Sequence, residues 1–503
     1  MTSDDKNNGE TLEEVFSEPY MFNIPDATYD DLPELIGSLK RAAIDAYVRD
    51  KLAPPPAFFT LAEDHYLITV NSGAGGGSTT RITRPNSDGE GGGKASTITT
   101  NFGQTQCDDG DFTSEFESVR EEIKKILEPW IGLPKPKRIE HEMNECRQIV
   151  STLADRSSIT GGKIVPSGNI QTKVQSIHEE LVEMGGTTVE AFKTIIIENL
   201  GKIVNNLSTV TVFWGSTLGS EQGIFAKARE SVVSTVTQSI TLFNNVANSQ
   251  SGKLDTVLKI AKYAMEGFKL FVGNPATKLA LDSTGLSLEI LDGLKDEGKT
   301  SSKANTYEEG INALTTSFNI INNTIRKSEN SINNNLVANM SNMHSQKDSY
   351  DLALKATKSS EVQTKDKLRL DQSRIDNILG LSKSKIIEDL DKAWKKMENI
   401  DMTYCIDRDK RVGIGKGGPS VAFHHFKWLL HDLIRRLSEE TENSFKNFEL
   451  AVEYIKNEDM KSQSDLDAME NIINNPKGPD PWQKRDCQVD PQKPLKLIKL
   501  EKP

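Results

Sequence analysis

Two amphipathic segments that meet at a double glycine constrain the fold of this chain more than any other feature. Apolar residues recur every three or four positions on both sides of Gly185-Gly186. They are Ile170, Val174, Ile177, Leu181 and Met184 before the turn, and Val189, Phe192, Ile196, Leu200, Ile203 and Val204 after it. This spacing puts each set on one face of a helix. Residues 168–247 are therefore predicted to form a helical hairpin.

The same three-four spacing recurs along most of the chain. It is clearest over 30–51, 116–130, 137–155, 307–340, 375–400 and 421–455. The mean hydropathy of −0.49 is low for one compact globule of 503 residues and is typical of thin helical bundles, which expose most of their surface. We therefore predict an all-α fold, an elongated bundle of several hairpins with coiled-coil-like helices. The runs 307–340 and 375–400 are expected to lie antiparallel as one long hairpin.

Changes in composition divide the chain into six segments. They are a disordered acidic head (1–28), a small helical segment (29–70), a Gly/Ser/Thr-rich linker (71–111), a helical domain with a hairpin centred on 184–192 (112–295), a long helical hairpin domain ending in the 421–471 helix (296–474), and an extended Pro/Lys-rich tail (475–503). The linker is predicted to be flexible because it holds too little apolar surface to offset the entropy of ordering. A short β-like run, 66–70, precedes it.

Charge and cysteine usage exclude several classes of function. The net charge is −12, and residues 1–35 hold ten acidic residues against one basic residue, so the helical body is close to neutral. A nucleic-acid partner is not expected, because no basic stripe is present. Four widely spaced cysteines argue against a disulfide framework and against a structural zinc site. The first residues, Met-Thr-Ser-Asp-Asp, do not form a signal peptide, so any export is expected to be leaderless.

Two groups of residues could carry chemistry, and a structural role is favoured for both. The glycines around Gly413-Ile-Gly415-Lys416 could approach a phosphate, but a phosphate loop needs GxxxxGK[ST] between a strand and a helix. A turn before a helix is the favoured interpretation. His424 and His431 lie a heptad apart with His425 beside the first, and without an HExxH pattern they are interpreted as interfacial. No enzymatic activity is predicted, and no catalytic residue, cofactor or metal ion is assigned.

Two stretches without any charge, 203–220 and 231–252, stand out in the outgoing arm of the hairpin. Both contain Asn, Ser and Thr among their apolar residues, unlike an ordinary membrane-spanning helix. The favoured interpretation is a helix buried by its neighbours or by an oligomeric partner. The alternative is a segment that enters a membrane only after a rearrangement.

The turn resembles the WXG-type helical hairpin of type VII (ESX) secretion substrates, in which Trp-x-Gly joins two antiparallel helices. Met184-Gly185-Gly186 occupies that pattern with Met in place of Trp, and Phe192 matches the family's aromatic residue eight positions later. The family's second mark is a Tyr-x-x-x-Asp/Glu export signal, and Tyr454 with Glu458 match it. The two side chains would share one helix face. The long body is more similar to the larger, uncharacterised actinobacterial proteins of this type.

The resemblance implies a non-enzymatic binding protein, either a leaderless type VII secretion substrate or a secretion-associated factor. Its partner would be a protein of the secretion machinery or a helical chaperone. Association of several copies of the chain into a homo-oligomer is a further alternative. It would be made in the cytoplasm and exported to the cell surface or medium; the alternative location is the cytoplasm. Two other functions are considered: an α-helical pore-forming toxin, suggested by the long hairpins and uncharged runs, and an intracellular coiled-coil scaffold.

Overall fold

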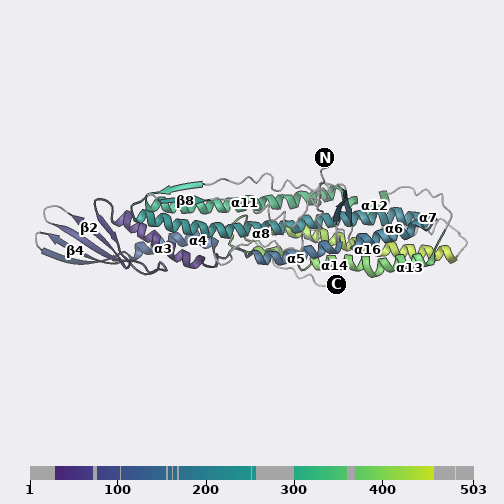
Figure 1. The fold of residues 1–503 in the computed structure, drawn as a ribbon, viewed down its shortest axis with the longest axis horizontal. Coiled ribbons are helices and arrows are strands. Elements are labelled where there is room, and N and C mark those ends of the chain that lie inside the picture. Colours follow the sequence, from purple (N-terminus) through teal and green to yellow (C-terminus); the bar gives the residue numbers. More distant parts are fainter. Residues whose placement is uncertain are drawn as a thin grey trace, which may run out of the picture.

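The computed structural model shows a long bundle of helices with a β-sheet at one end (Figure 1). It describes residues 29–71, 76–101, 104–153, 157–160, 163–166, 169–250, 252–256, 300–358, 369–457 and Trp482. The α-helices are α3 (Leu32–Tyr47), α4 (Thr113–Leu127), α5 (Pro136–Leu153), α6 (Asn169–Val182), α7 (Thr187–Ala191), α8 (Glu198–Ala247), α11 (Tyr307–Ser345), α12 (Leu352–Lys358), α13 (Gln372–Leu381), α14 (Ile387–Met397), α15 (Met402–Ile406) and α16 (Ser420–Asn457). Short π-helical segments η1 (Val48–Leu52), η3 (Phe192–Ile197) and η5 (Ser382–Ile386) continue α3, α7 and α13, and η2 (Glu128–Trp130) and η4 (Lys347–Ser349) are 3₁₀ turns.

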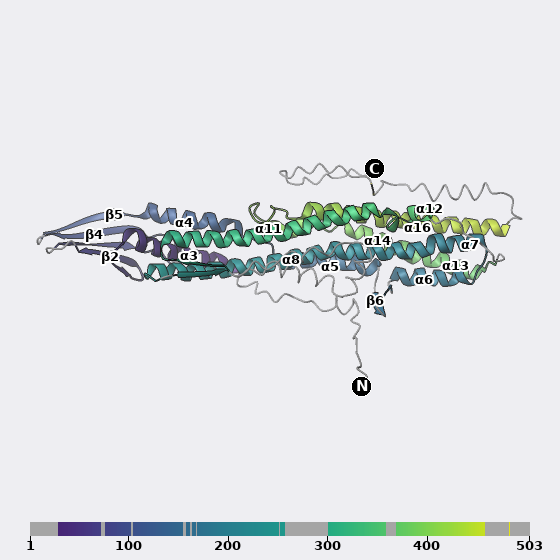
Figure 2. The same cartoon turned by 90° about the horizontal axis from the view of Figure 1, so that it is seen from above.

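Helix α8 is the central element of the bundle. Its 50 residues correspond to about 75 Å at 1.5 Å per residue. It packs against α3, α5, α11 and α16, and 36 of its residues are buried. A helix that buries residues on every side lies inside the bundle and not on its surface. Figure 2 shows α8 running along most of the rod.

Helices α11 and α16 both run antiparallel to α8. Tyr307 at the start of α11 packs beside Phe243 near the end of α8, with ring centroids 6.2 Å apart. At the other end of α11, Asn206 Nδ2 donates a hydrogen bond to the Ser349 carbonyl at 2.9 Å. On α16, Phe423 stacks on Trp214 with centroids 4.8 Å apart. The apolar stripe predicted from Ile311 onward faces this core.

The 375–400 region packs differently from the predicted pairing with 307–340. Helices α13 and α14, which form it, lie against α6, α5 and α16, while α11 lies against α8 and α16. Three-four spacing identifies the apolar face of a helix, but it does not identify the partner of that face.

The prediction of an all-α fold was wrong. Five antiparallel strands, in the order β1-β2-β3-β4-β5, form a sheet at one end of the rod (Figure 1). They are β1 (Phe58–Leu61), β2 (His65–Asn71), β3 (Gly77–Thr83), β4 (Lys94–Asn101) and β5 (Gln104–Asp111). Two further two-stranded sheets pair β6 (Ser157–Thr160) with β7 (Lys163–Pro166), and β8 (Gly252–Thr256) with β9 (Thr300–Ala304).

In the segment predicted as a flexible linker, 71–111, the described residues instead form strands β3 to β5 and the turn between β3 and β4. The β-like run 66–70 lies within β2. Tyr66 on β2 anchors the sheet, because its hydroxyl donates to Asp45 Oδ1 on α3 at 2.6 Å and its ring packs edge-on to Phe116 of α4. The glycines have a turn role: Gly89, Gly91, Gly92 and Gly93 all adopt φ between +71° and +92°, where glycine is favoured.

Three predicted segments fall outside the described residues. The acidic head (1–28) is one, and the tail (475–503) is another except for Trp482. The third is 257–299, most of the helical stretch predicted for 253–295.

Candidate functional site

The hairpin turn lies at the end of the rod opposite the sheet, where three parts of the chain meet (Figure 2). Helix α6 ends at Val182, and α7 begins at Thr187, so Met184, Gly185 and Gly186 form the turn. Gly185 and Arg369 form an isolated antiparallel β-bridge. The Gly185 N–H donates to the Arg369 carbonyl at 2.9 Å, and the Arg369 N–H donates to the Gly185 carbonyl at 3.0 Å. Gly186 has φ +117°. The turn is thus fixed by backbone hydrogen bonds to a segment that precedes α13.

Helix α16 packs directly against the outgoing arm of the hairpin. The Phe192 ring stacks on Phe448 with centroids 4.3 Å apart and meets Phe445 edge-on at 5.2 Å. Met184 and Phe192 are both buried. The aromatic position suggested by the WXG-type resemblance therefore forms a contact between helices.

Of the two residues of the predicted export signal, the structure describes only Tyr454. Tyr454 lies in the last turns of α16, beyond Phe448, and is partly buried. Glu458 lies outside the described residues. Tyr454 is therefore on the helix that packs against Phe192, at the same end of the rod as the turn.

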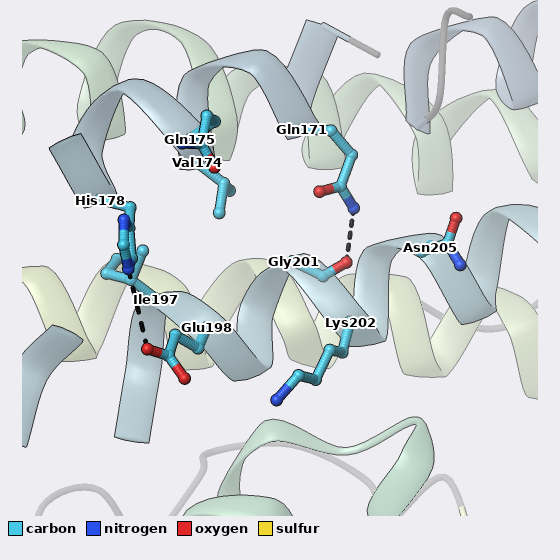
Figure 3. A pocket seen from close by; sticks show the side chains of 9 residues that line it. All are labelled: Gln171, Val174, Gln175, His178, Ile197, Glu198, Gly201, Lys202 and Asn205. Atoms are coloured by element: carbon cyan, nitrogen blue, oxygen red, sulfur yellow. Dashed lines mark hydrogen bonds and ion pairs between the residues drawn. The ribbon is translucent and has the colours of Figure 1, made fainter. Parts of the chain in front are cut away.

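A groove with a volume of about 430 Å³ lies between α6 and α8, close to this turn (Figure 3). His178 Nε2 of α6 lies 3.7 Å from Glu198 Oε1 of α8. Gln171 Nε2 donates to the Gly201 carbonyl at 2.5 Å and joins the same two helices. No serine or cysteine is among the nine lining residues, so the groove presents no hydroxyl or thiol nucleophile beside His178.

The chain was also compared with known proteins. No family model, curated protein or solved structure matches it significantly. The interpretation of its function therefore depends on its own residues and geometry.

The uncharged run 203–220 lies in the first half of α8. Every residue in it is buried except Asn205 and Asn206, which are partly buried. Its two faces differ in polarity. Asn205, Thr209, Ser216 and Ser220 form a narrow strip on one face, bordered by Val212 and Phe213. The opposite face contains Ile203, Leu207, Val210, Trp214 and Leu218.

Five of the six hydroxyl groups of this run donate hydrogen bonds within α8 itself. Thr209, Thr211 and Thr217 donate to carbonyls three or four residues earlier at 2.9, 2.7 and 2.7 Å. Ser216 and Ser220 do the same at 2.6 and 3.3 Å. Buried hydroxyls cost free energy only when they lack a partner. These five hydroxyls therefore depend little on the surrounding helices, whereas Asn206 and Trp214 donate to the Ser349 and Phe423 carbonyls outside α8.

None of the described helices combines enough residues with enough apolar character to cross a membrane. In α8, the hydroxyl and amide side chains described above lower the hydropathy of the uncharged run.

Two of the three histidines of α16, His424 and His431, contact residues of other elements. His424 Nε2 is 3.1 Å from Asp401 Oδ1, and its Nδ1 lies 2.7 Å from the Ser420 carbonyl. The His431 ring lies edge-on to Trp394 and Trp428, and its Nδ1 is 3.0 Å from Asp432. Burial lowers the pKa of His425. Among the residues that the structure describes, no three His, Cys, Asp or Glu side chains are grouped to hold a metal ion.

The glycine loop, residues 407–419 between α15 and α16, surrounds a carboxylate of the protein itself. Ile414 N donates to Glu329 Oε2 of α11 at 2.9 Å, and Gly413 N donates to Asn322 Oδ1 at 2.7 Å. A Cβ at position 413 would collide with Glu329. The Ile414 amide faces an anion, as in a phosphate loop, but this anion is the Glu329 side chain, which holds the turn before α16 in place.

A buried charge cluster, Glu221 of α8, Glu329 of α11 and Arg408 of the glycine loop, was missed at the sequence level. Arg408 forms an ion pair with Glu329, and both side chains are fully buried. Glu221 is fully buried too, and neither of its carboxyl oxygens accepts a hydrogen bond from the described residues. Burial raises the pKa of both carboxyl groups, and for Glu221 the nearby Glu329 raises it further.

A signal for this cluster exists in the sequence. Glu221 follows Trp214 and Leu218 at helical spacing, and Glu329 follows Ile325 in the same way. An acidic residue in an apolar stripe predicts a buried carboxyl group. The spacing does not reveal that the two acidic residues, 108 positions apart, share one arginine.

Proposed function

We propose that this protein is an α-helical pore-forming protein, in which α8 leaves the bundle and enters a membrane as one of several copies, because no described helix is apolar enough to cross a membrane by itself. The observation that carries the proposal is the uncharged, buried run 203–220 with its internally satisfied hydroxyls. In a bilayer, every polar atom of a spanning helix needs a partner within the protein. The run meets that requirement with few contributions from its neighbours.

The length and the two faces of the run support the same proposal. Eighteen residues span about 27 Å, close to the hydrocarbon thickness of roughly 30 Å. In an assembly of several copies, the Asn/Ser/Thr face would line water, and the face that contains Leu207, Val210 and Trp214 would contact lipid or a neighbouring helix. The charged residues nearest to the run, Lys202 and Glu221, flank it, so they would lie outside the hydrocarbon layer.

Trp214 provides a direct test, because it lies within the run and its indole N–H donates to the Phe423 carbonyl at 3.2 Å in the closed bundle. The full-length chain is mixed with dye-loaded vesicles of zwitterionic or anionic lipid at acidic, neutral and alkaline pH. We expect dye release, together with quenching of tryptophan fluorescence by brominated lipid. The quenched fraction should fall in Trp214→Phe and persist in Trp394→Phe, the matched control on α14.

The two readouts together decide the outcome. Absence of release in every lipid and at every pH would overturn the proposal. Release with equal quenching in both variants would show that another part of the chain inserts, and the role assigned to α8 would be wrong.

A second candidate function is that of a leaderless type VII secretion substrate, and the packing of Phe192 on Phe448 supports it. This contact brings the end of α16, which carries Tyr454, to the same end of the rod as the turn. Export and pore formation are compatible, because one describes a route and the other an action.

Export is tested by separating the cells and medium of the native host. Tyr454→Ala is expected to stay in the cells, whereas Tyr404→Ala, at a tyrosine that is 76% exposed, should be exported like the wild type. Undiminished export of Tyr454→Ala would rule out the signal. Retention of every variant, wild type included, would favour an intracellular scaffold.

A further inference from the structure

The buried charge cluster contains two carboxyl groups and only one guanidinium that pairs with them. Arg408 forms an ion pair with Glu329, and it also donates hydrogen bonds to the Ile406 and Val412 carbonyls at 3.2 and 3.3 Å. Its guanidinium lies over the Phe225 ring at 4.8 Å. Because Glu221 has no hydrogen-bond donor among the described residues, its charged form would be poorly stabilised in this site.

The groups around Glu221 do not supply the missing positive charge. Glu329 raises the pKa of Glu221 and Arg408 lowers it. The charges of Glu221 and of Glu142 on α5 both raise the pKa of Cys405 on α15. Arg326 of α11 acts on Glu329 and donates to the Gly413 carbonyl at 3.0 Å. On α16, His424 is paired with Asp401. The closed site is therefore balanced when one of its two carboxyl groups keeps a proton.

The cluster holds the glycine loop against the long helices. Asn322, Arg326 and Glu329 lie along one face of α11, and all three bind this loop. The loop leads directly into α16, whose Phe423 stacks on Trp214 of α8. Release of the loop would free the start of the helix that covers the uncharged run.

We propose that Glu221, Glu329 and Arg408 form a proton-dependent lock, which holds the glycine loop closed while the two carboxyl groups share one proton and opens when both ionise. Loss of the proton from Glu221 leaves two carboxylates against the one guanidinium that is paired here, in a fully buried site. Opening hydrates the second carboxylate. This regulation extends the proposed function, because α8 would be released after the lock opens, but the lock can be tested without a membrane.

The direction of the pH effect follows from the raised pKa of Glu221 in the closed state. The open state has an ordinary glutamate pKa of about 4.3. Since the closed state binds the proton more tightly, the closed form is favoured at low pH and loses stability as the pH rises. The equilibrium constant for opening should increase up to tenfold per pH unit from about pH 4 to the raised pKa of the closed state. Above that pKa it should be constant.

Hydrogen exchange of the loop amides measures this opening in the full-length chain. Gly413 and Ile414 donate their N–H groups to Asn322 and Glu329, so they exchange when the loop opens. We expect exchange in the wild type, corrected for the intrinsic rate, to rise with pH as above. Glu221→Gln should have a weaker pH dependence of opening than the wild type, because it removes the carboxyl group without a hydrogen-bond donor and leaves only the raised pKa of Glu329.

Glu440→Gln is the matched control, because Glu440 is a buried carboxyl at a different site, where burial raises its pKa to about 7. It should keep the pH dependence of the loop. A pH-dependent profile in Glu221→Gln equal to that of the wild type would overturn the lock. If Glu221→Gln does not fold, the wild type alone decides, since pH-independent opening of its loop would also overturn the proposal.

The lock and the pore fail in distinguishable ways. A pH-dependent loop without dye release would leave the lock in place and remove the pore. Dye release with a pH-independent loop would keep the pore and remove the lock.

Discussion

Gly186 adopts a backbone conformation that residues with a side chain rarely take. Its φ of +117° and ψ of 157° lie in a region occupied almost only by glycine, and it is the N-cap residue of α7, directly after the Gly185 bridge to Arg369. A Cβ would strain the backbone, and the bridge restricts its relaxation. The need for a glycine here is therefore conformational.

We expect Gly186→Ala to lower the free energy of unfolding by about 1–3 kcal/mol, measured by denaturant titration. Gly380→Ala is the control, because Gly380 is exposed in α13 with open space around its Cβ position. Alanine there should be neutral or add up to about 1 kcal/mol from helix propensity. Equal effects of the two substitutions would contradict the conformational explanation.

The value of glycine as a sequence signal differed between sites. Gly185-Gly186 lies between two clear helical stripes, so the hairpin turn was predicted. Gly89 to Gly93 lies between Ser/Thr-rich stretches, and the same residue type was interpreted as part of a flexible linker. In the structure, Arg120 Nε donates to the Gly89 carbonyl at 2.7 Å and holds this turn against α4. That contact joins residues 31 positions apart and leaves no local pattern.

At the scale of elements, the stacking of Phe192 on Phe448 joins α16 to the hairpin. Substituting leucine for either ring keeps an apolar side chain but removes the stacking. We expect a double-mutant cycle of Phe192→Leu and Phe448→Leu to give a coupling of about 0.5–1.5 kcal/mol in the free energy of unfolding.

A second cycle, of Phe192→Leu and Phe243→Leu, serves as the control. Phe243 packs beside Tyr307 near the opposite end of the 50-residue α8, so the two effects should add within about 0.5 kcal/mol. A coupling near zero in the first cycle would mean that α16 and the hairpin do not form the described contact in solution.

Helices were predicted well from the sequence, and strands were not. The stripes of α5, α11 and α16 follow the helical period closely, because each helix buries one face. Strands β3 to β5 contain mostly Ser, Thr, Gly, Gln and Asp, and all eight residues of β5 are exposed. A sheet with few buried side chains lacks the alternation of apolar and polar residues by which strands are recognised.

For the whole molecule, the rod shape predicts a solution size that a compact chain would not reach. A compact 503-residue domain has a radius of gyration of about 23 Å, whereas α8 alone is about 75 Å long. Small-angle X-ray scattering should give a radius of gyration above 23 Å and a maximum dimension above 75 Å. A value at or below 23 Å would contradict the extended arrangement.

The candidate site was only partly accessible to sequence reasoning at this scale. The absence of charge over 203–220 was visible, and so was the alternative of a membrane-entering segment. Which helices cover the run depends on contacts such as Trp214 with Phe423, 209 residues apart. Contacts over such separations follow from the packing of the whole bundle and not from any local pattern.

The enclosure of α8 by helices on both sides of it in the chain also sets the order of events during synthesis. Helix α16 ends about 200 residues after α8. At roughly 5–20 residues per second, the ribosome needs on the order of 10–40 s to make that part of the chain. During this interval the apolar face of α8 lacks the helix that covers Trp214. The nascent chain thus presents to chaperones, and to other copies of itself, a surface that the finished rod conceals.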